Sequence, residues 1–282
     1  MKAFEFFARC VVNQKVEHCF ALLGDANMQV AATMADLGVT FTYVQHEHCA
    51  VAASMAYARK TQTVGVSTVT CGPGLTQIMT ALPAAVRARI PLVIFTGESP
   101  TNKSWYNQQI EQRPFVEATG ARYVQLHTHK RFEEGIQEAF LIAVRDQVPV
   151  VIGTPFDLLH GDIAELPRNE TPLHEIYRKS VSIPSGKYQE ISNLAEILNI
   201  ADRPIIMAGL GATKPETAKH ISLLAERCDA FLTTTLPARG LFHDDPFYLG
   251  VSGGFASQVT RKFLAESDLI VAFGASISSH NS

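Results

Sequence analysis

The chain has 282 residues, 46% of them hydrophobic and 18% charged, which supports a packed core and about two domains and argues against disorder. Its 24 Lys and Arg against 27 Asp and Glu give a net charge of −3, unlike the strongly basic surface of a nucleic-acid-binding protein. The sequence has no uninterrupted apolar run of about 18 residues, so a membrane protein is not expected. The acidic Glu5 stands where a secretory signal would be apolar, so a secreted protein is not expected either.

The first half of the chain alternates short β-branched runs with longer helical patterns. Helices are predicted over residues 4–12, 28–37, 47–59, 75–89 and 131–147. Strands or short apolar runs are predicted over residues 17–23, 40–44, 64–69, 91–95, 122–126 and 148–153. This alternation predicts an α/β fold, a doubly wound parallel sheet with helices on both faces.

The alternation fades over residues 154–187, where prolines recur at positions 155, 167, 172 and 184. Prolines at such spacing are typical of irregular connecting segments. We therefore expect a first domain over residues 1–166 and a linker over residues 167–187 that lies over this domain.

A second alternating region is expected over residues 188–282. Its predicted helices span residues 188–200, 216–227 and 259–266, and its predicted strands span residues 204–208, 230–234 and 268–273. About three strands are few for a doubly wound sheet, because each parallel strand needs a crossover to reach its neighbour. The region is either a minimal lobe or, as we favour, the first part of an incomplete Rossmann-like central domain inside which the sequence stops.

Polar or glycine-rich segments follow several predicted strands, at residues 24–27, 46–48, 70–74 and 96–98. Ligands of open parallel sheets bind at the carboxyl ends of the strands, so these segments are expected to gather on one rim. Gly72-Pro73-Gly74 permits a tight turn that a ligand can approach closely, although most such turns have no further role. For Asp25 and Asn27, capping of the following helix is the simpler interpretation.

Glu47 stands just after a predicted strand, at the expected first turn of an alanine-rich helix. A carboxyl against the small apolar residues 50–58 would be poorly solvated, which favours its neutral form and lets it share a proton with a ligand nitrogen. The alternative is an N-terminal helix acid that is stabilised only by the helix dipole.

Metal ligands and disulfides are not expected in this chain. His46 and His48 flank Glu47, but a third ligand of suitable geometry is not evident. The five cysteines include no Cys-x-x-Cys pair, which indicates reduced thiols in a cytoplasmic protein. Cys71, beside the glycines, is interpreted as a small buried residue.

Several motifs follow one another at a characteristic spacing: Gly24-Asp25-x-Asn27, His46-Glu47, Tyr57-Ala58-Arg59, Gly65-Val66, Thr70-x-Gly72-Pro73-Gly74-x-Thr76 and residues 91–97. In this order they resemble the pyrimidine-binding domain of thiamine-diphosphate-dependent enzymes of the acetolactate synthase and 2-oxo acid decarboxylase group. The resemblance covers residues 1 to about 165. Residues 189–274 are similar to the beginning of that family's central domain, most clearly at residues 236–240 and 267–274.

The resemblance implies a thiamine diphosphate site with Glu47 as its catalytic residue. In the family, a carboxyl bonded to a ring nitrogen of the aminopyrimidine favours the imino form that deprotonates the thiazolium carbon, and an apolar setting strengthens this bond. By the same resemblance the cofactor-binding residues are Glu47, Thr70, Gly72, Pro73, Gly74, Gly24 and Asp25.

Two positions bear on the substrate. Asp25 matches an aspartate that relays protons in pyruvate-decarboxylase-like members, which also carry a His-His pair in the loop after the fourth strand. Residues 104–113 contain no histidine, which argues against simple decarboxylation to an aldehyde. Ile110-Glu111-Gln112 resembles carboligases and lyases in which a glutamine faces the substrate. Asp25 and Gln112 are therefore predicted substrate contacts, with an exposed polar loop residue as the alternative for Gln112.

The resemblance places the diphosphate and its Mg²⁺ on a domain not present in this chain. Family members hold Mg²⁺ through a Gly-Asp-Gly signature followed by asparagines. The nearest string, Gly161-Asp162-Ile163, lacks these partners. Gly209-x-Gly211 lacks the third glycine and the acidic ribose ligand of an NAD-binding loop, and FAD stays undecided.

The expected function is that of the N-terminal portion of an enzyme that makes or breaks C–C bonds next to a carbonyl. It would be an acetolactate synthase-like carboligase or lyase, or a 2-oxo acid decarboxylase, with a small 2-oxo acid or aldehyde as substrate. Family sites lie between subunits, so we expect a homo-oligomer or a partner chain carrying the diphosphate-binding domain, and an inactive chain alone. The alternative is a non-catalytic binding subunit or scaffold.

Overall fold

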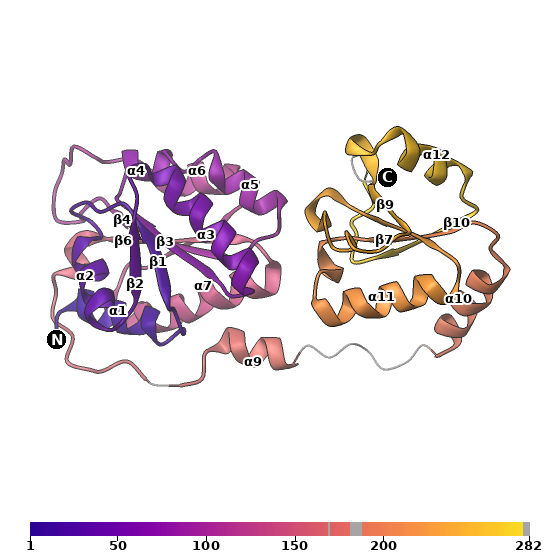
Figure 1. Ribbon diagram of the computed structural model, residues 1–282. Coiled ribbons are helices and arrows are strands. Elements are labelled where there is room, and N and C mark those ends of the chain that lie inside the picture. The colour runs from indigo at the N-terminus through magenta and orange to yellow at the C-terminus, as the bar shows by residue number, and fades with distance from the viewer. Residues whose placement is uncertain (169, 181–187, 279–282) are drawn as a thin grey trace. The chain divides into compact units, whose positions relative to one another are not determined.

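A computed structural model describes residues 1–168, 170–180 and 188–278 of the chain (Figure 1). The chain forms two compact units, residues 1–182 and 183–282, and each is described by itself. The helices of the first unit are α1 (Ala3–Val12), α2 (Met28–Asp36), α3 (Glu47–Thr61), α4 (Pro73–Thr76), α5 (Ala81–Arg87), α6 (Gln112–Ala118), η1 (His129–Arg131), α7 (Phe132–Asp146), α8 (Phe156–Leu159) and α9 (Leu173–Ser180). Its strands are β1 (His18–Ala21), β2 (Thr40–Tyr43), β3 (Gly65–Val69), β4 (Leu92–Glu98), β5 (Arg122–Gln125) and β6 (Pro149–Pro155).

The strands of the first unit form one parallel sheet with the order β2-β1-β3-β4-β6-β5. Alternate residues of each strand face opposite helix layers. On β4, Val93 and Phe95 pack with α1, α2 and α7, whereas Leu92 and Ile94 pack with α3 and α5. Both faces are covered, which explains the near-continuous apolar sequence of the central strands and confirms the predicted doubly wound sheet.

The predicted helix over residues 75–89 is wrong, because two shorter helices, α4 and α5, occupy this stretch. Pro83 lies in the first turn of α5, where a missing N–H is tolerated. A continuous helix would instead need Pro83 to donate to the carbonyl of Met79, so the chain turns before α5 begins.

Three α-helices of the first unit lie in stretches for which the sequence suggests none, among them the four-residue α8. α6 begins at Gln112 in a polar stretch, and α9 lies within the predicted linker. α9 packs against α7, where the buried His174 ring lies 5.6 Å from the ring of Phe140. Leu173 and Ile176 on the same helix are exposed. The compact first unit therefore includes α9.

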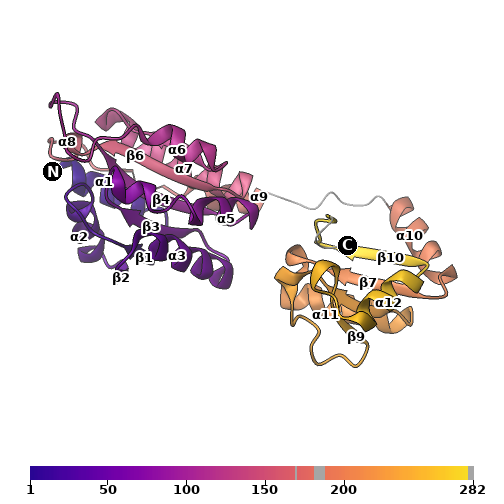
Figure 2. The same ribbon diagram turned by 90° about the horizontal axis from the view of Figure 1, so that it is seen from above.

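The second unit holds a smaller parallel sheet, seen from above in Figure 2. Its strands β7 (Pro204–Ala208), β8 (Phe231–Thr234), β9 (Tyr248–Val251) and β10 (Leu269–Phe273) have the order β10-β7-β8-β9. Its helices are α10 (Tyr188–Ile200), η2 (Leu210–Ala212), α11 (Pro215–Arg227), η3 (Leu236–Ala238), η4 (Gly253–Phe255) and α12 (Gln258–Glu266). The count of about three strands is wrong because it misses β9, which is short, half-buried and paired with β8 through an irregular register.

None of the described helices is both long enough and apolar enough to cross a membrane.

Candidate functional site

The strand order places a topological switch point at the carboxyl end of β1. β2 and β3 lie on opposite sides of β1, so the loops that leave β1 and β3 diverge there. Such a topological switch point is where open parallel sheets bind ligands. The residues 24–27 loop follows β1, and the glycine turn, Gly72-Pro73-Gly74, follows β3.

Glycines bring these loops close together. A Cβ built on Gly24 would lie 2.6 Å from Thr70 Oγ1, and one on Gly74 would lie 2.6 Å from Thr70 Cγ2 and 3.4 Å from Glu47 Oε1. A Cβ on Gly97 would lie 2.4 Å from Cβ of Ala26. The ends of β1, β3 and β4 and the start of α3 therefore meet, as the predicted gathering on one rim requires.

Glu47 is the first residue of α3, and its side chain is half-buried. The His46 ring caps the helix, since His46 Nδ1 accepts the His48 N–H at 3.1 Å. Among the described residues, none hydrogen-bonds to or forms an ion pair with the Glu47 carboxylate. The carboxylate therefore keeps its acceptor positions for a ligand, in a place where the helix dipole also favours an anion. No group of three or more potential metal ligands occurs in the described part of the chain.

Thr70 offers a test of whether a polar ligand fits here. Its side chain is 9% exposed, and within the described ranges its Oγ1 has no hydrogen-bond partner. Leaving a buried hydroxyl unpaired costs about 1–3 kcal/mol. An unpaired hydroxyl between two glycines and beside a free carboxylate fits a heterocyclic ligand with hydrogen-bonding nitrogens.

The glycine turn has a conformation that only glycine adopts readily. Gly72 has φ +59°, and a Cβ there would lie 1.9 Å from the backbone oxygen of Gln108. Its N–H donates to Gln112 Oε1 at 2.7 Å. Pro73 is the first residue of α4, where a missing N–H costs nothing. The turn is thus held from both sides by the segment that begins α6.

The expected capping role of Asn27 is wrong. No side-chain capping bond occurs at the start of α2. Asn27 is buried instead, and its Oδ1 accepts the Gly24 N–H at 2.8 Å. Its Nδ2 donates to Leu22 O at 3.1 Å and to Thr68 Oγ1 at 3.0 Å. Asn27 therefore shapes the loop after β1 from within.

Asp25 is exposed at the tip of this loop. Burial raises the pKa of the nearby Cys71 thiol, and the charge of Asp25 adds to this rise. The same two causes, burial first, contribute to raising the pKa of Tyr106 to about 12. Cys71 is a buried, protonated residue, as the sequence suggests.

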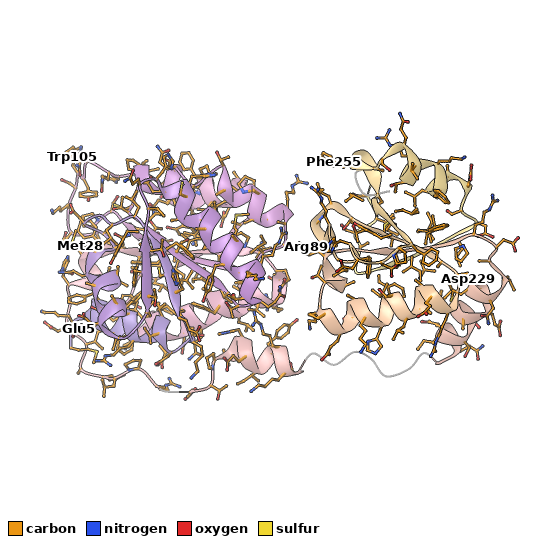
Figure 3. All side chains as sticks on the ribbon, viewed as in Figure 1. Glu5, Met28, Arg89, Trp105, Asp229 and Phe255 are labelled. Atoms are coloured by element: carbon orange, nitrogen blue, oxygen red, sulfur yellow. The ribbon has the colours of Figure 1, made fainter. Side chains whose placement is uncertain are left out.

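The loop between β4 and α6 contributes side chains to the same edge. Gln108 Oε1 accepts bonds from Cys71 Sγ at 3.3 Å and from the Tyr106 hydroxyl at 3.0 Å. Trp105, by contrast, is exposed, as Figure 3 shows. The loop therefore contacts the carboxyl edge of the sheet through Tyr106 and Gln108.

Gln112 is 3% exposed, so the alternative of an exposed loop residue is wrong. Its Nε2 donates to Gly97 O at 3.0 Å and to the Tyr123 hydroxyl at 3.1 Å. The prediction that it contacts substrate stays a prediction.

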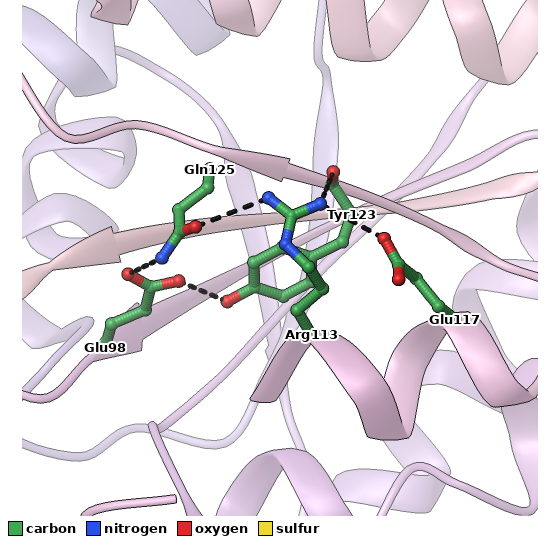
Figure 4. A network of polar contacts seen from close by, with 5 residues as sticks. All are labelled: Glu98, Arg113, Glu117, Tyr123 and Gln125. Carbon is green, nitrogen blue, oxygen red and sulfur yellow. Dashed lines mark hydrogen bonds and ion pairs between the residues drawn. The ribbon is translucent and has the colours of Figure 1, made fainter. Parts of the chain in front are cut away.

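Tyr123 connects Gln112 to a wider polar network (Figure 4). Its hydroxyl donates to Glu98 Oε1 at 2.6 Å, and Glu98 Oε2 accepts from Gln125 at 2.8 Å. The Arg113 guanidinium lies 5.1 Å from the centre of the Tyr123 ring and donates to Gln125 Oε1. Among these residues, only Glu98, at the end of a predicted strand, indicated this network from the sequence.

The remaining glycine motifs have structural roles. Asp162, beside Gly161, is exposed and forms an ion pair with Lys2 at 3.0 Å. A Cβ on Gly209 would lie 2.3 Å from Gly274 O, and Gly211 N–H donates to the same oxygen at 2.9 Å. These glycines let two backbone segments of the second unit pack directly on each other.

The parallel sheet and its glycine-lined carboxyl edge define the first unit as an α/β ligand-binding domain. Residues 1–117 match the family model described as "Thiamine pyrophosphate enzyme, N-terminal TPP binding domain", and residues 191–282 match the one described as "Thiamine pyrophosphate enzyme, central domain". The chain belongs to the thiamine pyrophosphate enzyme family.

Similar proteins carry names of this family. The chain is 28% identical over 291 residues to the acetolactate synthase large subunit of Buchnera aphidicola, covering 96% of this chain and 48% of that protein. It is 29% identical over 275 residues to the sulfoacetaldehyde acetyltransferase of Castellaniella defragrans, covering 96% and 44%. A probable acetolactate synthase large subunit of Methanocaldococcus jannaschii is 25% identical over 288 residues, covering 99% and 48%. The chain spans about half the length of these relatives.

Proposed function

We propose that the first unit binds the pyrimidine half of thiamine diphosphate in an enzyme that makes or breaks a C–C bond next to a carbonyl. The observation that carries this proposal is the position of Glu47 Oε1 beside Gly74, with the unpaired Thr70 hydroxyl between Gly24 and Gly74. When bound, thiamine diphosphate supplies a nucleophilic carbon and an electron sink.

The residues of the chain have distinct tasks in this proposal. Glu47 holds a proton between its carboxyl and a ring nitrogen of the pyrimidine, and its half-buried setting limits loss of that proton to water. Thr70, the glycine turn and Gly24, which lies against Thr70, line the pyrimidine side. Asp25, exposed on the same rim, faces the substrate side and moves protons there.

The reaction class favoured is carboligation or lysis rather than simple decarboxylation. Residues 104–113 hold no histidine pair, and Ile110-Glu111-Gln112 resembles carboligases and lyases. The substrate would be a small 2-oxo acid or aldehyde. The Mg²⁺ and diphosphate ligands would come from the diphosphate-binding domain of the assembled enzyme, across an interface between subunits.

The test is Glu47→Gln in the assembled enzyme, with exchange of the thiazolium C2 hydrogen followed by NMR. Loss of a positioned acid–base group costs about 10²–10⁴-fold in rate, so we expect exchange to slow by that order while thiamine diphosphate still binds in calorimetry. Glu216→Gln is the matched control, because Glu216 also lies in the first turn of a helix but in the second unit. Unchanged exchange in Glu47→Gln would refute the assignment.

A further inference from the structure

The polar groups of Gln112 are engaged inside the protein. Its oxygen accepts the Gly72 N–H, and its nitrogen donates to Gly97 O and to the Tyr123 hydroxyl. Both amide hydrogens and one acceptor position are thus occupied by protein groups. A side chain in this state is suited to hold the glycine turn rather than to contact a substrate.

The orientation of this amide follows from a chain of donors and acceptors. The Glu98 carboxylate only accepts, so the Tyr123 hydroxyl must donate to it at 2.6 Å. The Tyr123 oxygen can then only accept, so the Gln112 nitrogen faces it and the Gln112 oxygen faces Gly72. Burial, and then the charge of Glu98, raise the pKa of Tyr123, which keeps the hydroxyl protonated at neutral pH.

Gly153 makes the contact between Glu98 and Tyr123 possible. β6 lies between β4 and β5, so these two side chains must meet across it. A Cβ on Gly153 would lie 2.0 Å from the Tyr123 hydroxyl and 2.6 Å from Glu98 Oε1. Only glycine leaves room for the bond at this point of β6.

We propose that Glu98, Tyr123 and Gln112 are positioning residues that fix the glycine turn for the pyrimidine of the cofactor. Glu98 orients Tyr123, Tyr123 orients the Gln112 amide, and that amide holds the Gly72 N–H. This proposal rests on the proposed function, since it assigns the turn to cofactor binding. None of these side chains needs to touch the cofactor or the substrate.

The first test measures hydrogen exchange of the Gly72 amide by NMR in the full chain. We expect Tyr123→Phe to speed this exchange about fivefold, and Gln112→Ala by tenfold or more, because each loosens the bond that protects the amide. Tyr248→Phe is the matched control, since it also removes a hydroxyl bond, to Thr234 at 2.7 Å in the second unit. Wild-type exchange at Gly72 in Tyr123→Phe would overturn the proposal.

A second test uses two substitutions that preserve side-chain size. Glu98→Gln leaves one acceptor oxygen for two donors, the Tyr123 hydroxyl and the Gln125 amide, so the bond to Tyr123 should weaken and Gly72 exchange should rise. Adding Gln125→Glu should restore slow exchange, because residue 125 would then accept from residue 98 and from Arg113, which already donates to Gln125 at 3.3 Å. If Tyr123→Phe loosens the whole sheet, Glu98→Gln with and without Gln125→Glu still tests whether the donor–acceptor chain protects the Gly72 amide. Failure of the second substitution to restore slow exchange would overturn the proposal.

The link to the cofactor is tested with thiamine as the probe, by following the Gly72 and Gly74 amide signals. The expected result is a half-saturating thiamine concentration about threefold to tenfold higher in Tyr123→Phe than in wild type. An unchanged value in that variant would overturn the positioning role. Gly72 and Gly74 amide signals that do not shift when thiamine is added to wild type would refute the proposed function. The Gly72 exchange rates would still test the donor–acceptor chain in that case.

The same variants separate positioning from direct substrate contact. In the assembled enzyme, Tyr123→Phe should raise the thiamine diphosphate concentration needed for half-maximal rate and leave the KM of the 2-oxo acid near wild type. If Gln112→Ala raised that KM and left Gly72 exchange unchanged, Gln112 would be a substrate contact and the proposal would be wrong.

Discussion

The two units bury different kinds of polar side chain. Among the described residues, the buried polar side chains of the second unit all carry hydroxyls: Thr233, Thr234, Thr235, Ser252 and Thr260. The first unit buries hydroxyls too, but also the amides and the imidazole of Gln14, Asn27, Gln112 and His174. An amide has two donors and an oxygen with two acceptor positions, so it can connect more segments than a hydroxyl can.

This difference has a consequence for the edge of each sheet. Gln112 bonds to three groups from separate segments, and Asn27 bonds to two groups of its own loop and to Thr68 on β3; both lie under the loops of the candidate site. In the second unit the Thr233 hydroxyl donates to Gly250 O at 2.8 Å and fastens only β8 to β9. The two parallel sheets thus fasten their loops with different side chains, buried amides in the first unit and buried hydroxyls in the second.

The largest expected effect concerns the glycine turn. Gly72→Ala forces a left-handed conformation on alanine and drives its Cβ into the Gln108 backbone, and we expect unfolding of the first unit to become easier by about 4 kcal/mol. Gly254→Ala in the second unit is the control, because nothing lies within 4 Å of its Cβ position. Chemical denaturation followed by unit-specific NMR signals measures both. Equal losses of unfolding free energy in Gly72→Ala and Gly254→Ala would contradict the proposed difference between the two units.

Acid should weaken the first unit selectively. Burial, and then the charge of Arg178, lower the pKa of His174 from 6.5 to about 4. As pH falls, His174 therefore takes up a proton in the unfolded chain before it does so in the folded one, which favours unfolding. The free energy of unfolding keeps its full value above about pH 6.5 and decreases toward pH 4. The loss should be on the order of 3 kcal/mol, measured as unfolding free energy against pH.

The control for this pH profile is a second histidine variant. His174→Gln should flatten the acid side of the profile, whereas His220→Gln, on an exposed residue of the second unit, should leave it unchanged. A profile that stays steep in His174→Gln would assign the acid sensitivity to other groups.

A smaller effect separates amides from hydroxyls. Asn27→Ala leaves the Gly24 N–H, Leu22 O and Thr68 Oγ1 without their partner, and we expect it to lower the free energy of unfolding by about 2 kcal/mol. Thr233→Val removes one bond in the second unit and should cost about 1 kcal/mol. Equal losses in denaturant titrations would mean that the number of bonded groups does not matter.

The smallest effect concerns two hydroxyls that have no partner within the described ranges, those of Ser67 and Thr70. Thr70→Val and Ser67→Ala should each leave the free energy of unfolding unchanged or raise it by about 1 kcal/mol, since no bond is lost and a buried unpaired hydroxyl is removed. Thiamine diphosphate affinity should fall in Thr70→Val alone, because only Thr70 lies between Gly24 and Gly74. Calorimetry of the assembled enzyme with both variants tests this, and equal affinities would remove Thr70 from the site.

Much of the fold could be predicted because hydrophobic periodicity reports burial directly. The central strands β3, β4 and β6 are buried on both faces, so their apolar runs are plain in the sequence. β9 could not be predicted, because it is half-buried and irregularly paired. Pro83 indicates the break before α5, but helical periodicity alone predicts one continuous helix there.

The candidate site could be predicted in part for a similar reason. Glycine and polar residues after strands locate the carboxyl edge without knowledge of the strand order, so Glu47, Thr70 and the glycine turn were accessible from the sequence. The network of Glu98 and Tyr123 depends on β6 lying between β4 and β5, which the sequence does not reveal. The bracing role of Asn27 was hidden for another reason, since asparagine before a helix usually caps it.

The packing of α9 on α7 has a practical consequence for protein engineering. A fragment cut after residue 166 would lack α9, and the Phe140 surface that His174 covers would face water. Such a fragment would tend to aggregate, whereas one that extends through Ser180 would retain this cover. Expression boundaries for the N-terminal unit are therefore better placed beyond α9 than at the fading of the sequence pattern.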